Sequence, residues 1–300
     1  MRQSARIRVV VATVVVSGGT IALTPSVAQA TGTATLVATH STSSWGRPSP
    51  DPAGITYDPA NQRLVVSDSE VDETPLYRGT NVFFSSLSGQ QTASNPGWTT
   101  EPWSYEPTGV NRLTASLSLV SDDDADKMFL VSTGSDGKPT GTPRSFTTRP
   151  TNGDNEDADR TADGHILSID GVNRTVYDYG PGPNGRFDGV APAGDDTRVA
   201  INVGQYGAKN PEGIEYYAAR NAILVVDNDT KAVYELSRSG GLINKISIAA
   251  ANPRHAAGIT LAPASNGSGK QNLYIVDRGV DNNTNPREND GRFYEMSAPL

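Results

Sequence analysis

The feature that most constrains the fold of this chain is a short pattern that occurs five times along it. In each copy a turn leads through a small or acidic residue, usually followed by glycine, into two short apolar strands, and the second strand ends in aspartate. The copies begin at residues 52–55, 107–110, 156–158, 211–214 and 256–259, and their closing aspartates are Asp68, Asp122, Asp170, Asp227 and Asp277. A repeat of this length predicts a solenoid, a propeller or an array of repeated units.

The second strand of each copy is apolar along most of its length, as in residues 222–226 (Ala-Ile-Leu-Val-Val) and 273–276 (Leu-Tyr-Ile-Val). Continuous apolarity, in place of alternation, indicates a strand that is covered on both faces. A third strand with aromatic residues and a more polar fourth strand follow, although the fourth strand of the first copy is poorly defined near residues 91–99. The middle strands of a propeller blade lie between neighbouring blades, so the sequence predicts an all-β propeller of four-stranded blades.

Five copies, counted from Gly54, Gly109, Ala158, Gly213 and Gly258, predict five blades. A six-bladed ring would need a degenerate blade within residues 77–105. The last copy ends after its third strand, and residues 34–39 (Ala-Thr-Leu-Val-Ala-Thr) are expected to supply the missing fourth strand. This N-terminal strand would close the ring and remove the free sheet edges, which promote aggregation.

Residues 1–30 have the pattern of a signal peptide, with three arginines, an apolar stretch over residues 9–16 and a small-residue cleavage site at Ala28-Gln29-Ala30. We therefore expect a secreted, extracellular product that is cleaved near Ala30 and consists of a single β-propeller domain over residues 31–300. Cleavage would change the net charge from −8 to −11, because the removed segment holds three arginines and no acidic residue. That charge argues against nucleic acid and anionic membrane surfaces as partners. No second apolar stretch follows the predicted signal peptide, so we expect no membrane insertion, and we expect a monomer.

One face of the predicted ring is acidic. Strand direction alternates within a blade, so the turns after the second and fourth strands emerge on the same face, and they carry most of the chain's 33 acidic residues. Such crowding is unfavourable unless a cation offsets it, and Ca²⁺ prefers six to eight oxygen ligands. The candidate metal ligands are Glu212, Glu156, Asp157, Asp227, Asp277 and Asp281.

The closing aspartates also have a structural interpretation. An aspartate that ends a strand before a tight turn accepts hydrogen bonds from the turn amides, and its presence in every copy favours that role. Glu212 differs, because it breaks the repeat at the channel mouth, where other copies have Ala53, Thr108 and Ala257. We therefore expect function where the pattern is broken: at Glu212, at Glu156 and in the loop over residues 277–290.

Motifs of nucleophilic, phosphate-binding or thiol chemistry are absent from the sequence. A histidine–carboxylate pair on the acidic face would require His40 or His255 beside an acid, and we expect neither as the leading interpretation. Trp45, Trp98 and Trp103 precede first strands, where packing of the blade ends is favoured over a ligand surface.

Residues 52–59 (Pro-Ala-Gly-Ile-Thr-Tyr-Asp-Pro) and 211–216 (Pro-Glu-Gly-Ile-Glu-Tyr), with the strands that follow them, resemble secreted bacterial β-propellers of the NHL/TolB-like superfamily. The chain is similar to the SdiA-regulated and phytase-like propeller proteins. The resemblance implies a propeller, commonly six-bladed, in a group that contains Ca²⁺-dependent lactonases and esterases as well as interaction scaffolds. The phytase signature Asp-Ala-x-Asp-Asp-Pro-Ala is missing, so phytase activity is not implied.

Two functions follow from these observations. The first is a Ca²⁺-stabilised binding module that contacts a protein or glycan partner through the acidic face. The alternative is a metal-dependent hydrolase of lactonase or phosphoesterase type, with a cation held by Glu212 and its neighbours. A channel-mouth cluster of Glu212, Glu156 and further carboxylates would favour the hydrolase, whereas a channel plugged by apolar side chains would exclude it.

Overall fold

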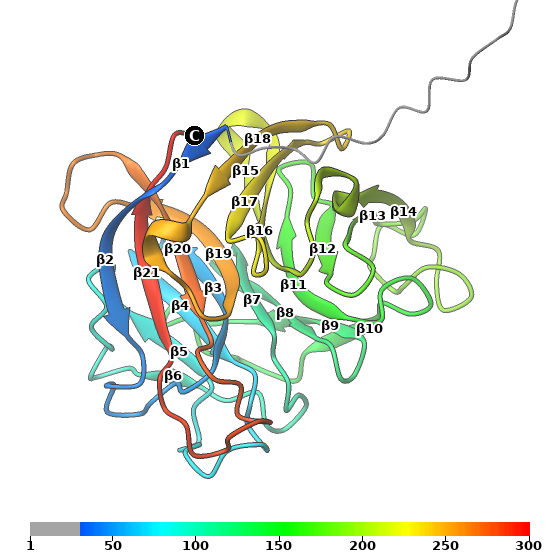
Figure 1. Cartoon of the computed structure of the whole chain (residues 1–300). Helices are drawn as coiled ribbons and strands as arrows, with labels where there is room; N and C mark the ends of the chain where they lie inside the picture. The colour runs from blue at the N-terminus through cyan, green and yellow to red at the C-terminus, as the bar shows by residue number, and fades with distance from the viewer. Residues whose placement is uncertain (1–30) are drawn as a thin grey trace, which may run out of the picture.

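In a computed structural model of the chain, residues 31–300 are described, and they form five β-sheets arranged around a common axis (Figure 1). The predicted signal peptide, residues 1–30, lies outside the described residues. The inner strands contact one another in the cyclic order β3, β7, β11, β15, β19 and back to β3. The prediction of a five-bladed all-β propeller is confirmed, and residues 77–105 belong to the first blade instead of forming a sixth.

The four strands of each blade are antiparallel. They follow chain order from the axis outward in four blades, and in the fifth the N-terminal strand β2 is outermost. The first blade consists of β3 (Pro52–Asp58), β4 (Arg63–Asp68), β5 (Val82–Ser85) and β6 (Gly97–Trp98), and the second of β7 (Gly109–Thr114), β8 (Leu117–Asp122), β9 (Lys127–Ser132) and β10 (Arg144–Thr147). The third blade consists of β11 (Asn155–Arg160), β12 (Ile166–Asp170), β13 (Thr175–Gly180) and β14 (Thr197–Asn202), and the fourth of β15 (Pro211–Tyr217), β16 (Ala222–Asp227), β17 (Ala232–Ser237) and β18 (Leu242–Ser247). The fifth blade consists of β19 (Ala256–Pro263), β20 (Gln271–Asp277), β21 (Arg292–Ser297) and β2 (Thr35–Ser41). Three short 3₁₀ helices, Val203–Tyr206, Ala218–Arg220 and Ala249–Ala251, lie in the connections.

The N-terminal strand closes the ring as the sequence predicts. Strand β2 pairs antiparallel with β21, with Thr39 opposite Tyr294, and Figure 1 shows the two strands side by side. A second N-terminal strand, β1 (Gly32–Thr33), was not predicted. It pairs in parallel with β18, with Gly32 opposite Ile246, and so adds a fifth strand to the fourth blade.

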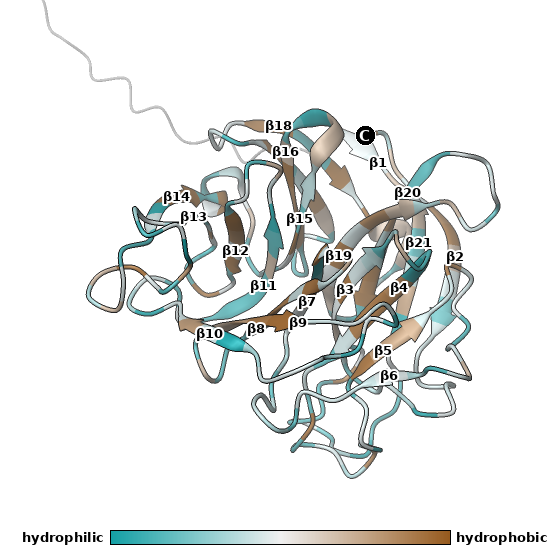
Figure 2. Ribbon diagram, turned by 180° about the vertical axis from the view of Figure 1, so that it is seen from behind, coloured by the Kyte–Doolittle hydropathy of each residue, from teal (hydrophilic) through white to brown (hydrophobic). Residues whose placement is uncertain are grey.

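The apolar core is divided into five clusters, one between each pair of adjacent blades. Alternate residues of one middle strand belong to different clusters. In β4, Val65 packs between the first and second blades, whereas Leu64 and Val66 pack between the fifth and the first. This arrangement explains why the middle strands are apolar on both faces. In Figure 2 these strands are mainly brown, while the acidic inner strand β11 is teal.

Glycine allows the inner strands to meet at the axis. A Cβ atom at Gly258 would lie 2.7 Å from the Cα of Gly54, and one at Gly54 would lie 2.8 Å from the Cα of Gly109. Gly213 occupies the same position in the fourth blade, because each of these glycines precedes the apolar residue that begins the inner strand's regular pairing.

The third blade departs from this rule and corrects one prediction. Asp157 pairs with Ile169, the residue before the closing Asp170, as Gly54 pairs with the residue before Asp68. The bulge between Asn155 and Asp157 therefore places Asp157, and not Ala158, at the glycine position. The ring of small residues, with this one carboxylate, separates the two ends of the axial channel.

Within residues 31–300 no helix is both long and apolar enough to span a membrane.

Candidate functional site

Loops from all five blades converge at one end of the axis and form a surface that we call the acidic mouth. These loops precede the inner strands or follow the second strands, as predicted. The acidic mouth contains these charged or titratable residues, which lie close enough to influence one another: Asp51, Glu70, Glu73, Glu106, Asp123, Asp154, Glu156, Glu212, His255, Arg278 and Asp281.

Arg278 is the one arginine buried among these acids. Its Nε donates to Asp51 Oδ1 at 2.5 Å, its Nη2 donates to Glu70, and Asp281 Oδ2 lies 3.9 Å away. Asp51 and Glu70 are fully buried, and Arg278 is 9% exposed. The guanidinium therefore neutralises part of the mouth from within, and the charges of Asp51 and Glu70 raise the pKa of Arg278 against the effect of burial.

A second group of carboxylates has no such partner. Oxygens of Asp123, Asp154 and Glu156 lie within 4.8 Å of one another, and no ion pair reaches them from any residue between 31 and 300. Asp123 Oδ1 is buried and has no hydrogen-bond partner among the described residues. Burial, followed by the charges of Asp154 and Asp124, raises the pKa of Asp123 to about 7, and burial with the charge of Glu212 raises the pKa of Glu156.

A third group, Glu70, Glu73 and Glu106, adjoins the first through Glu70. One oxygen of Glu70 binds Arg278, while its other oxygen, Oε2, is buried without a hydrogen-bond partner among the described residues. Burial raises the pKa of Glu106 to about 11, and the charge of Glu70 is the next largest cause of this rise. Burial also raises the pKa of Glu70 to about 8, in spite of Arg278. The pKa values of these carboxyls are raised because several acids are buried close to one another, which favours their neutral forms.

Glu212 contacts a histidine at this mouth. His255 Nε2 lies 3.3 Å from Glu212 Oε1, and the Asn210 side chain donates to the same oxygen. The histidine–carboxylate pair that the sequence analysis did not favour is therefore present. The charge of Glu212 also raises the pKa of Glu156, so the pair lies beside the uncompensated carboxylates.

The closing aspartates Asp227 and Asp277 accept hydrogen bonds from the backbone amides of nearby turns. Asp227 accepts from the backbone amides of Lys209, Asn210 and Thr230. Asp277 accepts from the amides of Arg254, His255 and Gly279 and from the Tyr294 hydroxyl. Both carboxylates are fully buried and surrounded by donors. These hydrogen bonds agree with the structural interpretation, and they leave little room for a metal at either residue.

The six predicted metal ligands thus separate into distinct environments. Glu156 and Glu212 lie together at the mouth, and Asp281 lies near Arg278. Asp157 instead lies at the axial constriction, where its oxygens accept from the amides of Ala158 and Ile214. The aromatic residues also have packing roles: Trp103 lies 4.6 Å from Phe129 and 6.3 Å from Trp98, measured between ring centroids.

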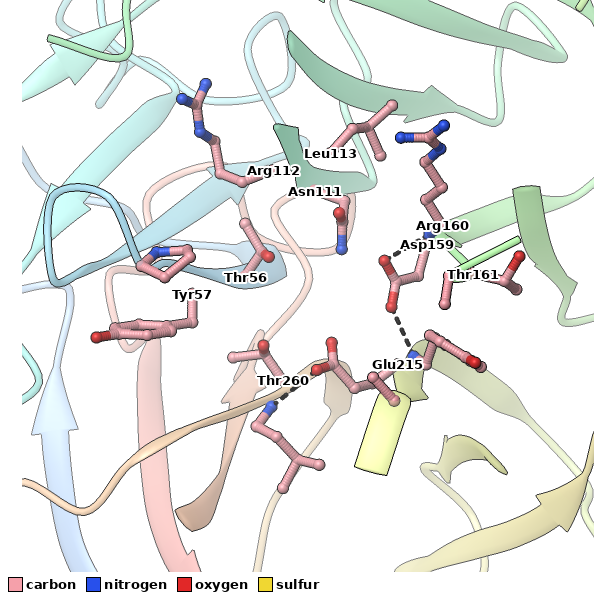
Figure 3. Close-up of a pocket in the computed structure, with 15 residues that line it drawn as sticks. Thr56, Tyr57, Asn111, Arg112, Leu113, Asp159, Arg160, Thr161, Glu215 and Thr260 are labelled. Atoms are coloured by element: carbon pink, nitrogen blue, oxygen red, sulfur yellow. Dashed lines mark hydrogen bonds between the residues drawn. The ribbon is translucent and has the colours of Figure 1, made fainter. Parts of the chain in front are cut away.

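The opposite end of the axis holds a cavity of about 450 Å³ (Figure 3). The inner strands of all five blades contribute polar residues to the wall, namely Thr56, Asn111, Asp159, Glu215 and Thr260, and Arg112 and Arg160 line it beside them. Asp159 Oδ2 accepts from the Tyr216 amide at 2.6 Å, and Glu215 Oε1 accepts from the Leu261 amide at 3.3 Å. Each carboxylate is thus held by the backbone of the next blade.

The chain has the fold of a five-bladed β-propeller. The chain is similar to a glutaminyl cyclase from Myxococcus xanthus, with 14% identity and a TM-score of 0.56 over 89% of this chain and 96% of that one. It is also similar to virginiamycin B lyase from Staphylococcus aureus (13% identity, TM-score 0.43, 76% of this chain and 63% of that one) and to the PQQ-bound aldose sugar dehydrogenase from Streptomyces coelicolor (12%, 0.46, 90% and 99%). No protein-family model matches the sequence, and no curated protein matches it significantly. The likeness to the glutaminyl cyclase shows the fold alone.

The sequence analysis missed Arg278, Asp159 and Glu215 as site residues. The sequence does contain a signal for Arg278. Arg278 follows the closing aspartate of the fifth copy, whereas the other copies have Ser69, Asp123, Gly171 and Asn228 at that position. A basic residue at that position in one copy only, on an acidic face, indicates an internal counter-charge. Asp159 and Glu215 likewise replace the neutral Thr56, Asn111 and Thr260 of the other blades.

Proposed function

We propose that this protein is an exported binding module whose acidic mouth holds Ca²⁺ and contacts a protein or glycan partner. The observation that carries the proposal is the group Asp123, Asp154 and Glu156, whose oxygens lie within 4.8 Å of one another and which forms no ion pair with any residue between 31 and 300. Export rests on the signal-peptide pattern of residues 1–30. The structures that share the fold include enzymes, so the fold itself leaves the type of function open.

The residues present suit a hard cation. The donor set consists of carboxylate oxygens, which Ca²⁺ prefers, and Asp123 Oδ1 is a buried oxygen without a hydrogen-bond partner among the described residues. Asp123, Asp154 and Glu156 would hold the ion, with Glu212 close enough for its charge to act on Asp154 and Glu156. When bound, the ion would neutralise these carboxylates and replace the protons that they otherwise retain.

The partner is expected to carry positive charge. Even with one divalent ion bound, acids such as Asp72, Asp124 and Asp229 remain exposed on the loops of this face. Complementary charge speeds association and sets orientation, and its effect weakens with added salt. A basic protein surface, or a glycan with amino groups, has the required chemistry.

Calcium is expected to stabilise the protein. At a concentration about 100-fold above Kd, a ligand specific to the folded state adds about 2.7 kcal/mol to the free energy of unfolding. For a domain of this size that stabilisation corresponds to a rise in Tm of roughly 5–10 °C. The test compares thermal unfolding in EDTA and in Ca²⁺. The double variant Asp123→Asn/Glu156→Gln should lose the response, and in EDTA it should be more stable than the parent because it removes two groups whose ionised forms repel each other.

Asp124→Asn is the matched control, because Asp124 adjoins Asp123 in sequence and is exposed. This variant should keep the full response to Ca²⁺. An identical Tm for the parent protein in EDTA and in saturating Ca²⁺ would refute the calcium site.

A second candidate function, a metal-dependent hydrolase, is favoured by one specific observation. The His255–Glu212 pair lies beside the carboxylate cluster, as a general base beside a cation would. The axis is also closed by glycine backbone and Asp157, and not by the apolar plug that would exclude this function. A cation here would polarise the substrate's carbonyl or phosphoryl oxygen. Glu212 would orient the His255 imidazole, which would accept a proton from water.

His255→Gln separates the two candidate functions. If the protein hydrolyses lactones or phosphate esters, this variant should lose about 10²- to 10⁴-fold in kcat while its Tm response to Ca²⁺ is unchanged. Assays with a panel of lactones and p-nitrophenyl phosphate, in Ca²⁺, provide the measurement. Turnover that is absent, or equal in parent and variant, would leave the binding module as the better interpretation.

A further inference from the structure

The cavity opposite the acidic mouth has the size and lining of a small-molecule site. Its volume of about 450 Å³ lies in the range of ligand pockets and far exceeds the space that a single ion needs. Apolar and aromatic groups, including Tyr57, Leu113, Tyr216 and Leu261, line it together with the polar ring. The wall thus combines polar groups, which can orient one end of a ligand, with aromatic and aliphatic surface that can contact its apolar body.

The polar ring carries negative charge on one side only. Thr56, Asn111 and Thr260 are neutral, whereas Asp159 and Glu215 come from the adjacent third and fourth blades. The charge of Asp159 acts on Glu215, so the two carboxylates are close enough to repel each other. Asp159 is 6% exposed, and Glu215 is partly exposed to the cavity. The repeat is therefore broken at two neighbouring positions that face the same space.

Arg112 and Arg160 also line the cavity, but within residues 31–300 neither of them forms an ion pair with Asp159 or Glu215. The guanidinium of Arg112 lies 3.7 Å from Asp58 and donates to Ser118 and Thr133, while Asn111 and the backbone supply the hydrogen bonds to Asp159. Figure 3 shows the guanidinium groups of Arg112 and Arg160 directed away from the space between Asp159 and Glu215. Among residues 31–300, neither carboxylate forms an ion pair. Charge that is buried without a partner is costly, and a bound cation would offset it.

We infer that this cavity binds a small organic cation, with its primary ammonium group between Asp159 and Glu215 and its apolar body against Tyr57 and Tyr216. An ammonium group has three donors, which match the free acceptor positions of two carboxylates already fixed by backbone amides. The cavity is too large for a lone metal ion. This inference is independent of the calcium site at the other end of the axis.

The test uses phenethylammonium as the probe, with 2-phenylethanol as its neutral analogue and 3-phenylpropionate as the anionic one. Titration calorimetry of the whole protein in EDTA keeps the acidic mouth free of metal. We expect saturable one-to-one binding of phenethylammonium, with a millimolar affinity that is reasonable for so small a probe. The neutral analogue should bind at least tenfold more weakly, and the anionic analogue should not bind.

Glu215→Gln and Asp159→Asn should each weaken binding of the probe at least tenfold. Each amide keeps an oxygen to accept the neighbouring backbone N–H, so both variants should fold, which circular dichroism would verify. Asp229→Asn removes the same charge from an exposed loop and should bind the probe as the parent does. Equal binding of 2-phenylethanol and phenethylammonium, unaltered affinity in both cavity variants, or no saturable binding of the probe to the folded protein would each overturn the inference.

Discussion

Replacing Arg278 with leucine is expected to lower the free energy of unfolding by about 3–5 kcal/mol. The substitution removes the cation that binds Asp51 and Glu70, both of which are fully buried. Two carboxylates would then remain in the interior without a counter-charge, next to the other acids of the mouth. Urea unfolding followed by circular dichroism measures the difference.

Two further variants show whether charge is the cause. Arg287→Leu makes the same change on an exposed side chain nine residues along, with no ion pair in the described structure, and should shift stability by less than about 0.5 kcal/mol. The triple variant Arg278→Leu/Asp51→Asn/Glu70→Gln removes the stranded charges and should recover much of the loss. Equal stability of the parent and Arg278→Leu would mean that the guanidinium does not neutralise these acids.

Alanine in place of Gly258 is expected to destabilise the ring by roughly 1–3 kcal/mol. The added methyl group would lie 2.7 Å from both the Ala53 carbonyl oxygen and the Gly54 Cα. These atoms belong to the backbone of the neighbouring blade and cannot move aside as a flexible side chain could. The effect would appear as a lower urea midpoint with an unchanged m value, since the same surface is exposed on unfolding.

Gly141→Ala is the control for this experiment. No heavy atom lies within 4 Å of a Cβ built at Gly141, so this change should leave the midpoint nearly unaltered. If Gly258→Ala were as stable as Gly141→Ala, the inner strands of the first and fifth blades could not approach each other as closely as the structure shows.

Much of the fold could be predicted because its signals are local. Residues 222–226 are apolar throughout because they are covered by blades on both sides, and that burial is recorded directly in the sequence. The N-terminal strand was predicted by elimination, because the last copy lacks a fourth strand. Strand β1 was not predicted, since two residues that pair through the backbone alone leave no pattern of side chains.

The site was less predictable because it depends on register and on distance between blades. A one-residue bulge decides that Asp157, and not Ala158, lies at the axis, and composition carries no record of such a shift. The acidic face was predicted as a whole. Its division into a part neutralised by Arg278 and a part around Asp123 without a basic partner depends on contacts between residues far apart in the chain.

The closing pair of strands has a consequence for the order of events in folding. Strand β2 belongs to the first segment of the described chain that a ribosome makes, and its partner β21 belongs to the last. Four blades can form hairpins from neighbouring residues, but the fifth stays incomplete until both ends of the polypeptide are available. Such a distant contact carries a large loop-closure entropy and slows folding. The fifth blade should therefore be the last to complete its sheet, after the four blades whose strands are contiguous in sequence.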